Sequence, residues 1–176
     1  MSSTCSFMMK IRGTMESCAK FANIITGKDT MDGRHFWRVS AGVCDSFFND
    51  QDEFVCIIDG ECAWSVSHCM TAGVGAYYYR NPKESLTLSD ISKELGLVIE
   101  AYSDDFCSFM EHIAYCDGEE LEYWSKDVAH FYYDDSEFGS FEEFQDEYGL
   151  YNYSESDLDE NDEIVIGALD KVFIYA

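Results

Sequence analysis

The side chains with the greatest capacity for chemistry are carboxylates, and most of them lie in the second half of the chain. Residues 100–176 contain 23 Asp and Glu against two lysines, Lys126 and Lys171, a formal charge of −21. The 176-residue chain has a formal charge of −24, so the first 99 residues contribute only −3. Such a charge repels nucleic acid and anionic membranes, and it attracts proteins with basic grooves.

Part of this acidic half is predicted to be a helix. A capping box opens the helix at Ser140, and a glycine follows its last residue, 148. The helix carries two like-charge pairs at i,i+4, Glu142 with Asp146 and Glu143 with Glu147, which oppose helix formation. Carboxylates about 5–6 Å apart on a helix can imitate one row of the phosphates of duplex DNA. The placement therefore favours a role in binding over a purely structural one.

Two tyrosines flank the acidic run, and tyrosine is enriched at the energetic centres of interfaces. Tyr151 and Tyr153 are therefore predicted to be interface anchors. The full set of predicted partner-binding residues is Asp134, Asp135, Glu142, Glu143, Asp146, Glu147, Tyr151, Tyr153, Asp157, Asp159, Glu160, Asp162 and Glu163.

Two patterns approach metal sites without completing them. Residues 157–161 match the first three ligand positions of a calcium loop, but Asp162 and Ala168 replace the glycine and the bidentate glutamate that such a loop requires. Cys62, His68 and Cys69 are the nearest approach to a zinc site, and their spacing fits no common zinc module. We therefore expect no metal and no cofactor.

No catalytic signature is found. The four histidines have no local motif with a cysteine nucleophile, and paired carboxylates are too abundant here to indicate acid–base catalysis. The sequence Gly-Val-Gly at 73–75 is too short for a phosphate loop. With 11 basic residues against 35 acidic ones, direct nucleic-acid binding is excluded. We expect a non-enzymatic protein.

The cysteine content bears on the compartment. The chain has eight cysteines, but its first residues lack a secretory apolar region and no apolar run approaches 18 residues. We expect a cytoplasmic protein of a bacterial host cell that does not contact membranes, with reduced thiols that behave as small buried hydrophobes.

Hydrophobic periodicity and turn residues predict the other elements. Two hairpin turns are predicted, at Asp59-Gly60 and at Asp117-Gly118. The predicted helices are residues 16–26, 87–95 and 140–148. The predicted strands are residues 4–12, 35–43, 53–58, 61–66, 97–102, 106–116, 119–124, 163–168 and 172–175.

This order predicts an α+β fold. The first hundred residues give strand, helix, strand, strand, helix, strand with an extra hairpin, which is the split β-α-β order of a ferredoxin-like fold. We expect a ferredoxin-like domain over residues 1–125. Residues 126–176 should form an acidic, aromatic-rich helix and strand extension packed on it, because disordered acidic tails are poor in aromatic residues.

Several short stretches resemble a known family. They are Gly-Glu-Cys-Ala-Trp-Ser-Val at 60–66, Cys-Met at 69–70, the strand 97–102 with Ser-Asp-Asp at 103–105, Phe-Met-Glu-His at 109–112, and the strand–glycine–helix at 9–21. Together they resemble the YubB-type ferredoxin-like domain of plasmid and phage proteins over about residues 5–125. One departure is Asp-Phe-Cys at 105–107, where similar proteins tend to have a Pro-Gly turn. The resemblance implies an origin in a mobile element and carries no catalytic residues.

These observations give two functional hypotheses. In the first, the chain is a phage or plasmid inhibitor of a bacterial defence system, an anti-CRISPR type of protein. Its acidic surface imitates nucleic acid and occupies the basic groove of a CRISPR effector or, next, a restriction enzyme. In the second, the chain is a self-associating interaction module, a homodimer through a sheet edge or face, and its acidic surface only confers solubility.

Overall fold

A six-stranded antiparallel sheet with the order β2-β3-β1-β4-β5-β6 forms the main body of this α+β protein. The computed structural model describes residues 4–72, 81, 83–105 and 109–176. The strands of this sheet are β1 (Thr4–Gly13), β2 (Val39–Phe48), β3 (Phe54–Ala63), β4 (Val98–Asp105), β5 (Phe109–Cys116) and β6 (Glu119–Asp127).

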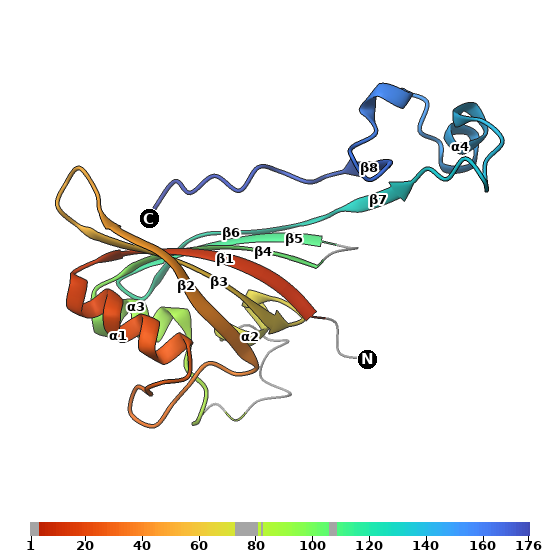
Figure 1. Cartoon of the computed structure of the whole chain (residues 1–176). Coiled ribbons are helices and arrows are strands. Elements are labelled where there is room, and N and C mark those ends of the chain that lie inside the picture. The colour runs from red at the N-terminus through yellow and green to blue at the C-terminus, as the bar shows by residue number, and fades with distance from the viewer. Residues whose placement is uncertain (1–3, 73–80, 82, 106–108) are drawn as a thin grey trace.

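Three helices cover one face of this sheet (Figure 1). They are α1 (Met15–Ile25), α2 (Val66–Met70) and α3 (Leu88–Leu95). The alternation in β1 explains the arrangement, because Phe7, Met9 and Ile11 are buried against the helices while the residues between them point to the other face. The main core therefore lies between the helices and the sheet.

Each long helix connects two strands that are separated by a third. β1 lies between β3 and β4, so α1 connects β1 to β2 across β3, and α3 connects β3 to β4 across β1. The predicted boundaries of α3 are confirmed. The Thr87 side chain accepts a hydrogen bond from the Asp90 amide, and Gly96 ends the helix in the left-handed conformation.

The predicted hairpin at Asp59-Gly60 is wrong, because both residues lie inside β3. A Cβ at Gly60 would stand 2.4 Å from the Ser40 carbonyl oxygen and 2.7 Å from the Phe7 ring. The glycine is required by the close approach of neighbouring strands and not by a turn. The chain turns instead before β3, where the Asn49 side chain accepts hydrogen bonds from two amides of the turn, and β2 consequently lies further along the chain than predicted. The Asp117-Gly118 turn is confirmed.

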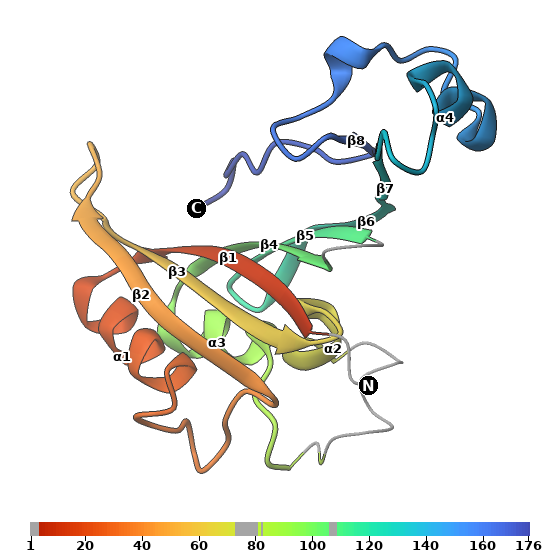
Figure 2. The same cartoon turned by 45° about the vertical axis from the view of Figure 1, so that its right-hand side comes forward.

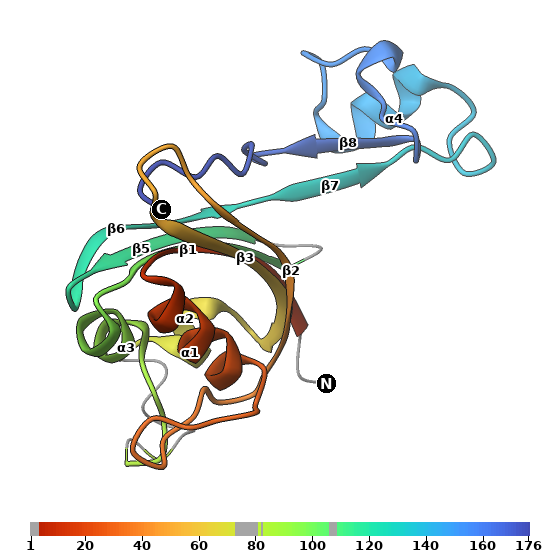
Figure 3. The same ribbon diagram turned by 60° about the vertical axis from the view of Figure 1, so that its left-hand side comes forward.

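Residues 129–166 form a separate acidic arm. A second, two-stranded sheet pairs β7 (Ala129–Tyr132) with β8 (Glu163–Ile166). Between these strands lie α4 (Phe141–Tyr148), as the capping box predicted, and the short 3-10 helix η1 (Glu155–Asp157). In Figures 1 and 3 β7 continues the direction of β6, and in all three views α4 lies away from the helices of the main body (Figures 1, 2 and 3). Strand β7 was not predicted.

The arm has a core of its own. Phe144, Leu150 and Ile164 are buried together, and further aromatic side chains pack around them. This cluster explains why the arm is folded despite its charge.

The last six residues, 171–176, return to the main sheet as an extended strap on the face opposite the helices (Figure 1). The predicted strand at 172–175 is wrong. Its amides from Ile174 onward donate to the Glu100 side chain and not to a neighbouring strand.

Candidate functional site: an acidic arm

The arm carries 13 Asp and Glu and no Lys or Arg. Its one histidine, His130, lies with Nδ1 2.5 Å from Oε1 of Glu163. Because the arm has its own core and projects from the sheet, these carboxylates surround a folded body and do not form a flexible tail. The arm therefore presents a field of one sign on several sides.

The predicted binding residues of α4 lie at the surface. The side chains of Glu142, Asp146 and Glu147 are exposed. Glu143 has a local role as well, because its Oε2 accepts a hydrogen bond from the Gly139 amide at 2.9 Å. The Ser140 hydroxyl in turn accepts from the Glu143 amide, which is one half of the predicted capping box, while the Glu143 carboxylate binds the Gly139 amide and not that of Ser140.

A second group of predicted residues meets in a groove of about 690 Å³ at the tip of the β7–β8 ribbon. The groove is lined by Tyr132, Tyr133, Asp134, Asp135, Glu137, Glu155, Asn161 and Asp162. Among the predicted residues, the groove brings together Asp134, Asp135 and Asp162 and does not include the carboxylates of α4. Glu137, Glu155 and the two lining tyrosines were not predicted.

The field in the groove acts on Tyr133. Its pKa is raised, first by burial and then by the neighbouring carboxylates of Glu155, Asp135 and Asp162. A negative field disfavours the phenolate and favours any cation nearby. The groove is therefore suited to a lysine or arginine side chain, which the two tyrosine rings could also contact through cation–π interactions.

Some predicted carboxylates shape loops. Asp134 accepts hydrogen bonds from the amide and hydroxyl of Ser136, and these bonds lower its pKa. Asp157 accepts from the Ser154 amide and hydroxyl, with the same effect on its pKa. Asp159 accepts from two amides further along the calcium-like segment. Within the described part of the chain, no group of three or more His, Cys, Asp or Glu is arranged to hold a metal ion.

The four remaining predicted residues differ in exposure. Tyr151 is 69% exposed and available as an anchor. Tyr153 is half-buried against the core of the arm, and its carbonyl accepts a hydrogen bond from Gln145 at 2.6 Å. Glu163 is buried in β8 beside His130. Glu160, in contrast, is exposed. Of these residues, Tyr151 and Glu160 offer the most accessible surface.

Cys62, His68 and Cys69, which were considered above as a zinc site, lie in or near α2. Cys62 and Cys69 are buried, while His68 is exposed and its Nδ1 lies 2.8 Å from the Ser65 hydroxyl. Hydrogen bonds with the Cys5 and Cys69 thiols, together with burial, raise the pKa of Cys62. These interactions favour the protonated thiol of Cys62, which is a poor nucleophile. The glycines at 73–75 and the departure at 106–107 lie outside the described residues.

Sequence reasoning missed a buried polar cluster beneath the strap. Glu100 and His112 are fully buried, although both belong to types that are rarely so. The signal was present, since Glu100 interrupts the apolar run Leu-Val-Ile-Glu-Ala-Tyr at 97–102. A charged residue in a strand with two covered faces indicates a specific partner.

Comparison of the chain with protein-family models, curated proteins and solved structures finds no match. Among the described residues, no helix is long and apolar enough to cross a membrane.

Proposed function

We propose that the chain is a non-enzymatic inhibitor that inserts its acidic arm into the basic nucleic-acid groove of a bacterial defence protein. A CRISPR effector is the first target and a restriction enzyme the second. In this role the arm takes the place of DNA or RNA, and the protein acts in the bacterial cytoplasm without binding nucleic acid itself.

The observation that carries this proposal is the folded, projecting arm with 13 carboxylates and no lysine or arginine. A groove that binds nucleic acid is lined by Lys and Arg, so the field of the arm complements it. Because the arm is already folded, little ordering entropy is lost when it binds. Exposed Glu142, Asp146 and Glu147 on α4 and the tyrosine-lined acidic groove at the tip supply two contact regions.

Two further observations support the proposed origin and architecture. Strands β1–β4 with α1 and α3 follow the strand order expected of a split β-α-β core, and we propose a ferredoxin-like fold for them, with β5 and β6 as the additional hairpin. The resemblance to YubB-type domains, proposed on the residues given above, supports the proposal that the chain comes from a phage or plasmid.

The test is affinity capture from bacterial lysates that contain defence systems, washed at low and at high salt. We compare the wild-type chain with a variant in which Glu142→Gln, Asp146→Asn and Glu147→Gln are combined. A matched control removes three exposed carboxylates of the main body, with Glu16→Gln, Asp50→Asn and Glu94→Gln. Glu143 is retained because it caps α4.

The proposal predicts that a nucleic-acid-processing protein is retained by the wild type and the control, is lost as the salt concentration rises, and is retained poorly by the arm variant. Its cognate nucleic acid should also displace it from the wild-type chain. Equal retention by the arm variant and the control would exclude α4 as the contact surface, and displacement by neither salt nor nucleic acid would exclude mimicry.

The second candidate is the self-associating module. Edge strand β2 exposes Val43, Phe47 and Phe48, at 46%, 40% and 60%. A β-bulge between Val43 and Asp45 interrupts the strand, however, and such bulges protect sheet edges from pairing. Sedimentation of the wild type and Phe48→Ser over a range of concentrations tests this candidate. A dimer that the substitution dissociates would favour it, and a monomer at all concentrations would exclude it.

A further inference from the structure

Three main-chain amides of the strap bind to one buried side chain, that of Glu100. Oε1 and Oε2 of Glu100 accept hydrogen bonds from the Ile174 amide at 2.9 and 3.0 Å. Oε2 also accepts from the amides of Tyr175 at 2.8 Å and Ala176 at 3.0 Å. The Glu100 side chain is 0% exposed. Three successive amides therefore satisfy a carboxylate that water cannot reach.

Aromatic rings and a histidine surround this carboxylate. Nε2 of His112 lies 2.9 Å from Oε1 of Glu100, and its Nδ1 lies at the same distance from Oε2 of Glu122, without the alignment of a hydrogen bond. The His112 ring stacks on Tyr102 at 4.3 Å between centroids, and Trp124 packs against both. Glu100, Tyr102, His112 and Trp124, contributed by β4, β5 and β6, are named the cradle below.

Two side chains of the strap enter the cradle. The Phe173 ring meets Tyr102 edge-on at 5.4 Å between centroids, and the Tyr175 ring is parallel to His112 at 6.4 Å. The residues between and before them point outward, since Ile174 is 71% and Val172 59% exposed. The cradle thus recognises a main chain and aromatic side chains at alternate positions.

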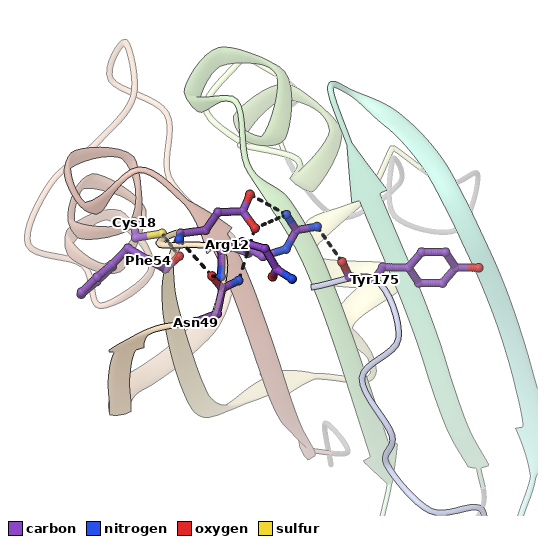
Figure 4. Close-up of polar contacts among 7 residues, drawn as sticks. Arg12, Cys18, Asn49, Phe54 and Tyr175 are labelled. Carbon is purple, nitrogen blue, oxygen red and sulfur yellow. Dashed lines mark hydrogen bonds and ion pairs between the residues drawn. The ribbon is translucent and has the colours of Figure 1, made fainter.

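Contacts at both ends fix the direction of the strap. Nη2 of Arg12 donates to the Tyr175 carbonyl at 2.9 Å, while its Nη1 is held by Glu53 at 2.7 Å (Figure 4). The Tyr102 hydroxyl donates to the Val172 carbonyl, and Lys171 pairs with Asp104. Side chains of β1 and β4 therefore form hydrogen bonds with both the carbonyl and the amide groups of the strap.

We propose that the cradle is a peptide-binding site. Its ligand is an extended peptide with aromatic side chains at alternate positions, and the strap is the resident ligand. The link at 167–170 that joins the strap to the arm is exposed, so the strap can leave the cradle without the core of the arm unfolding. The arm is joined to the sheet at its start through β6 and β7. When the strap occupies the cradle, the end of the arm is also held to the sheet. This inference does not depend on what the arm binds.

Amide hydrogen exchange in the full chain tests the resident contact. Ile174→Pro removes one of the three amide donors, and Ile174→Ala is the matched control that retains the amide and changes only an exposed side chain. The proline variant should accelerate exchange at residues 175 and 176 by at least about tenfold, while the alanine variant should match the wild type. Equal exchange in all three proteins would overturn the proposal.

Titration with a peptide tests the site itself. A synthetic peptide with the sequence of residues 169–176 is added to the Ile174→Pro chain and to the wild type, and binding is followed by NMR shifts of Trp124 and Tyr102. Saturable binding is expected to the proline variant and at least about tenfold weaker binding to the wild type, whose own strap competes at a high effective concentration. A peptide with proline at its sixth position should bind neither protein. Failure of the unmodified peptide to bind the released variant would overturn the proposal.

A substitution in the cradle provides the second check. Glu100→Gln, combined with Ile174→Pro, should abolish peptide binding because an amide cannot accept three main-chain donors equally. Glu111→Gln is the control, since Glu111 is a buried glutamate of the same sheet that accepts from Ser67 and Ser103 and does not contact the strap. Retained peptide binding after Glu100→Gln, with the fold verified by the exchange pattern of the main sheet, would contradict the assignment.

Discussion

The Glu100 carboxylate lies 2.9 Å from Nε2 of His112, and the two side chains are 0% and 1% exposed. They stand on neighbouring strands, β4 and β5, on the face of the sheet that the strap covers. A polar pair in this position has almost no access to water, so each partner depends on the other and on the strap amides for hydrogen bonds.

Removing the histidine should therefore be costly. His112→Leu is expected to destabilise the chain by about 1–3 kcal/mol, the range for a buried polar group that loses one partner, because Glu100 keeps its three amide donors. Urea unfolding of the single variants and of the double variant with Glu100→Gln measures the coupling. A double variant less stable than the sum of the single effects would contradict this interpretation.

The close approach at Gly60 gives a prediction for the main sheet. Gly60→Ala places a Cβ 2.4 Å from the Ser40 carbonyl, so the strands must separate, and we expect a loss of about 1–3 kcal/mol or more. Gly42→Ala is the matched control in the adjacent strand, because no atom lies within 4 Å of its new Cβ. Thermal unfolding should leave the control unchanged. Equal midpoints for the two variants would show that the sheet tolerates the contact.

The core of the arm should be separable from that of the main sheet. Phe144 is 0% exposed, and Phe144→Ala is expected to remove about 3–5 kcal/mol from the stability of the arm. Hydrogen exchange should accelerate in β7, α4 and β8 and remain slow in β1 and β3. Tyr151→Ala, at a side chain 69% exposed, is the control and should have little effect. Loss of protection in the main sheet would show that the two cores unfold together.

The negative field of the groove can be measured through Tyr133. Its pKa is raised, so the phenol keeps its proton to a higher pH than a free tyrosine, whose pKa is about 10. The folded state binds this proton more tightly. The resulting stability is complete below the ordinary pKa and is lost as the pH rises through the raised one.

Absorbance titration at the phenolate band, with Tyr133→Phe subtracted, reports this pKa directly. Burial is its first cause and Glu155 is the leading charge, so Glu155→Gln and added salt should both move the pKa down, though not fully to that of free tyrosine. A pKa that responds to neither change would show that burial alone is responsible, and the groove would then have no special attraction for cations.

Short-range signals were reliable guides to local structure. The helices that begin at Leu88 and Phe141 and end before Gly96 and Gly149 were predicted from their capping residues, because a cap involves a few neighbouring atoms. The hairpin turn at Asp117-Gly118 was predicted for the same reason. Aromatic content likewise indicated that the acidic segment is folded, but we expected it to pack on the main domain, and its separate core was not predicted.

By itself, the sequence determined the concentration of carboxylates after residue 100, the capped helices and the α+β class, since these follow from composition and local pattern. Only the tertiary structure decided that Gly60 lies at a close contact between strands and not in a turn, that Glu163 is buried, and which groups bind Glu100. A glycine is equally suited to a turn and to a close contact between strands, so its residue type does not distinguish them. The partners of a glutamate are set only when the chain folds. The strap amides lie more than 70 residues from Glu100, a distance at which local pattern carries no information about contact.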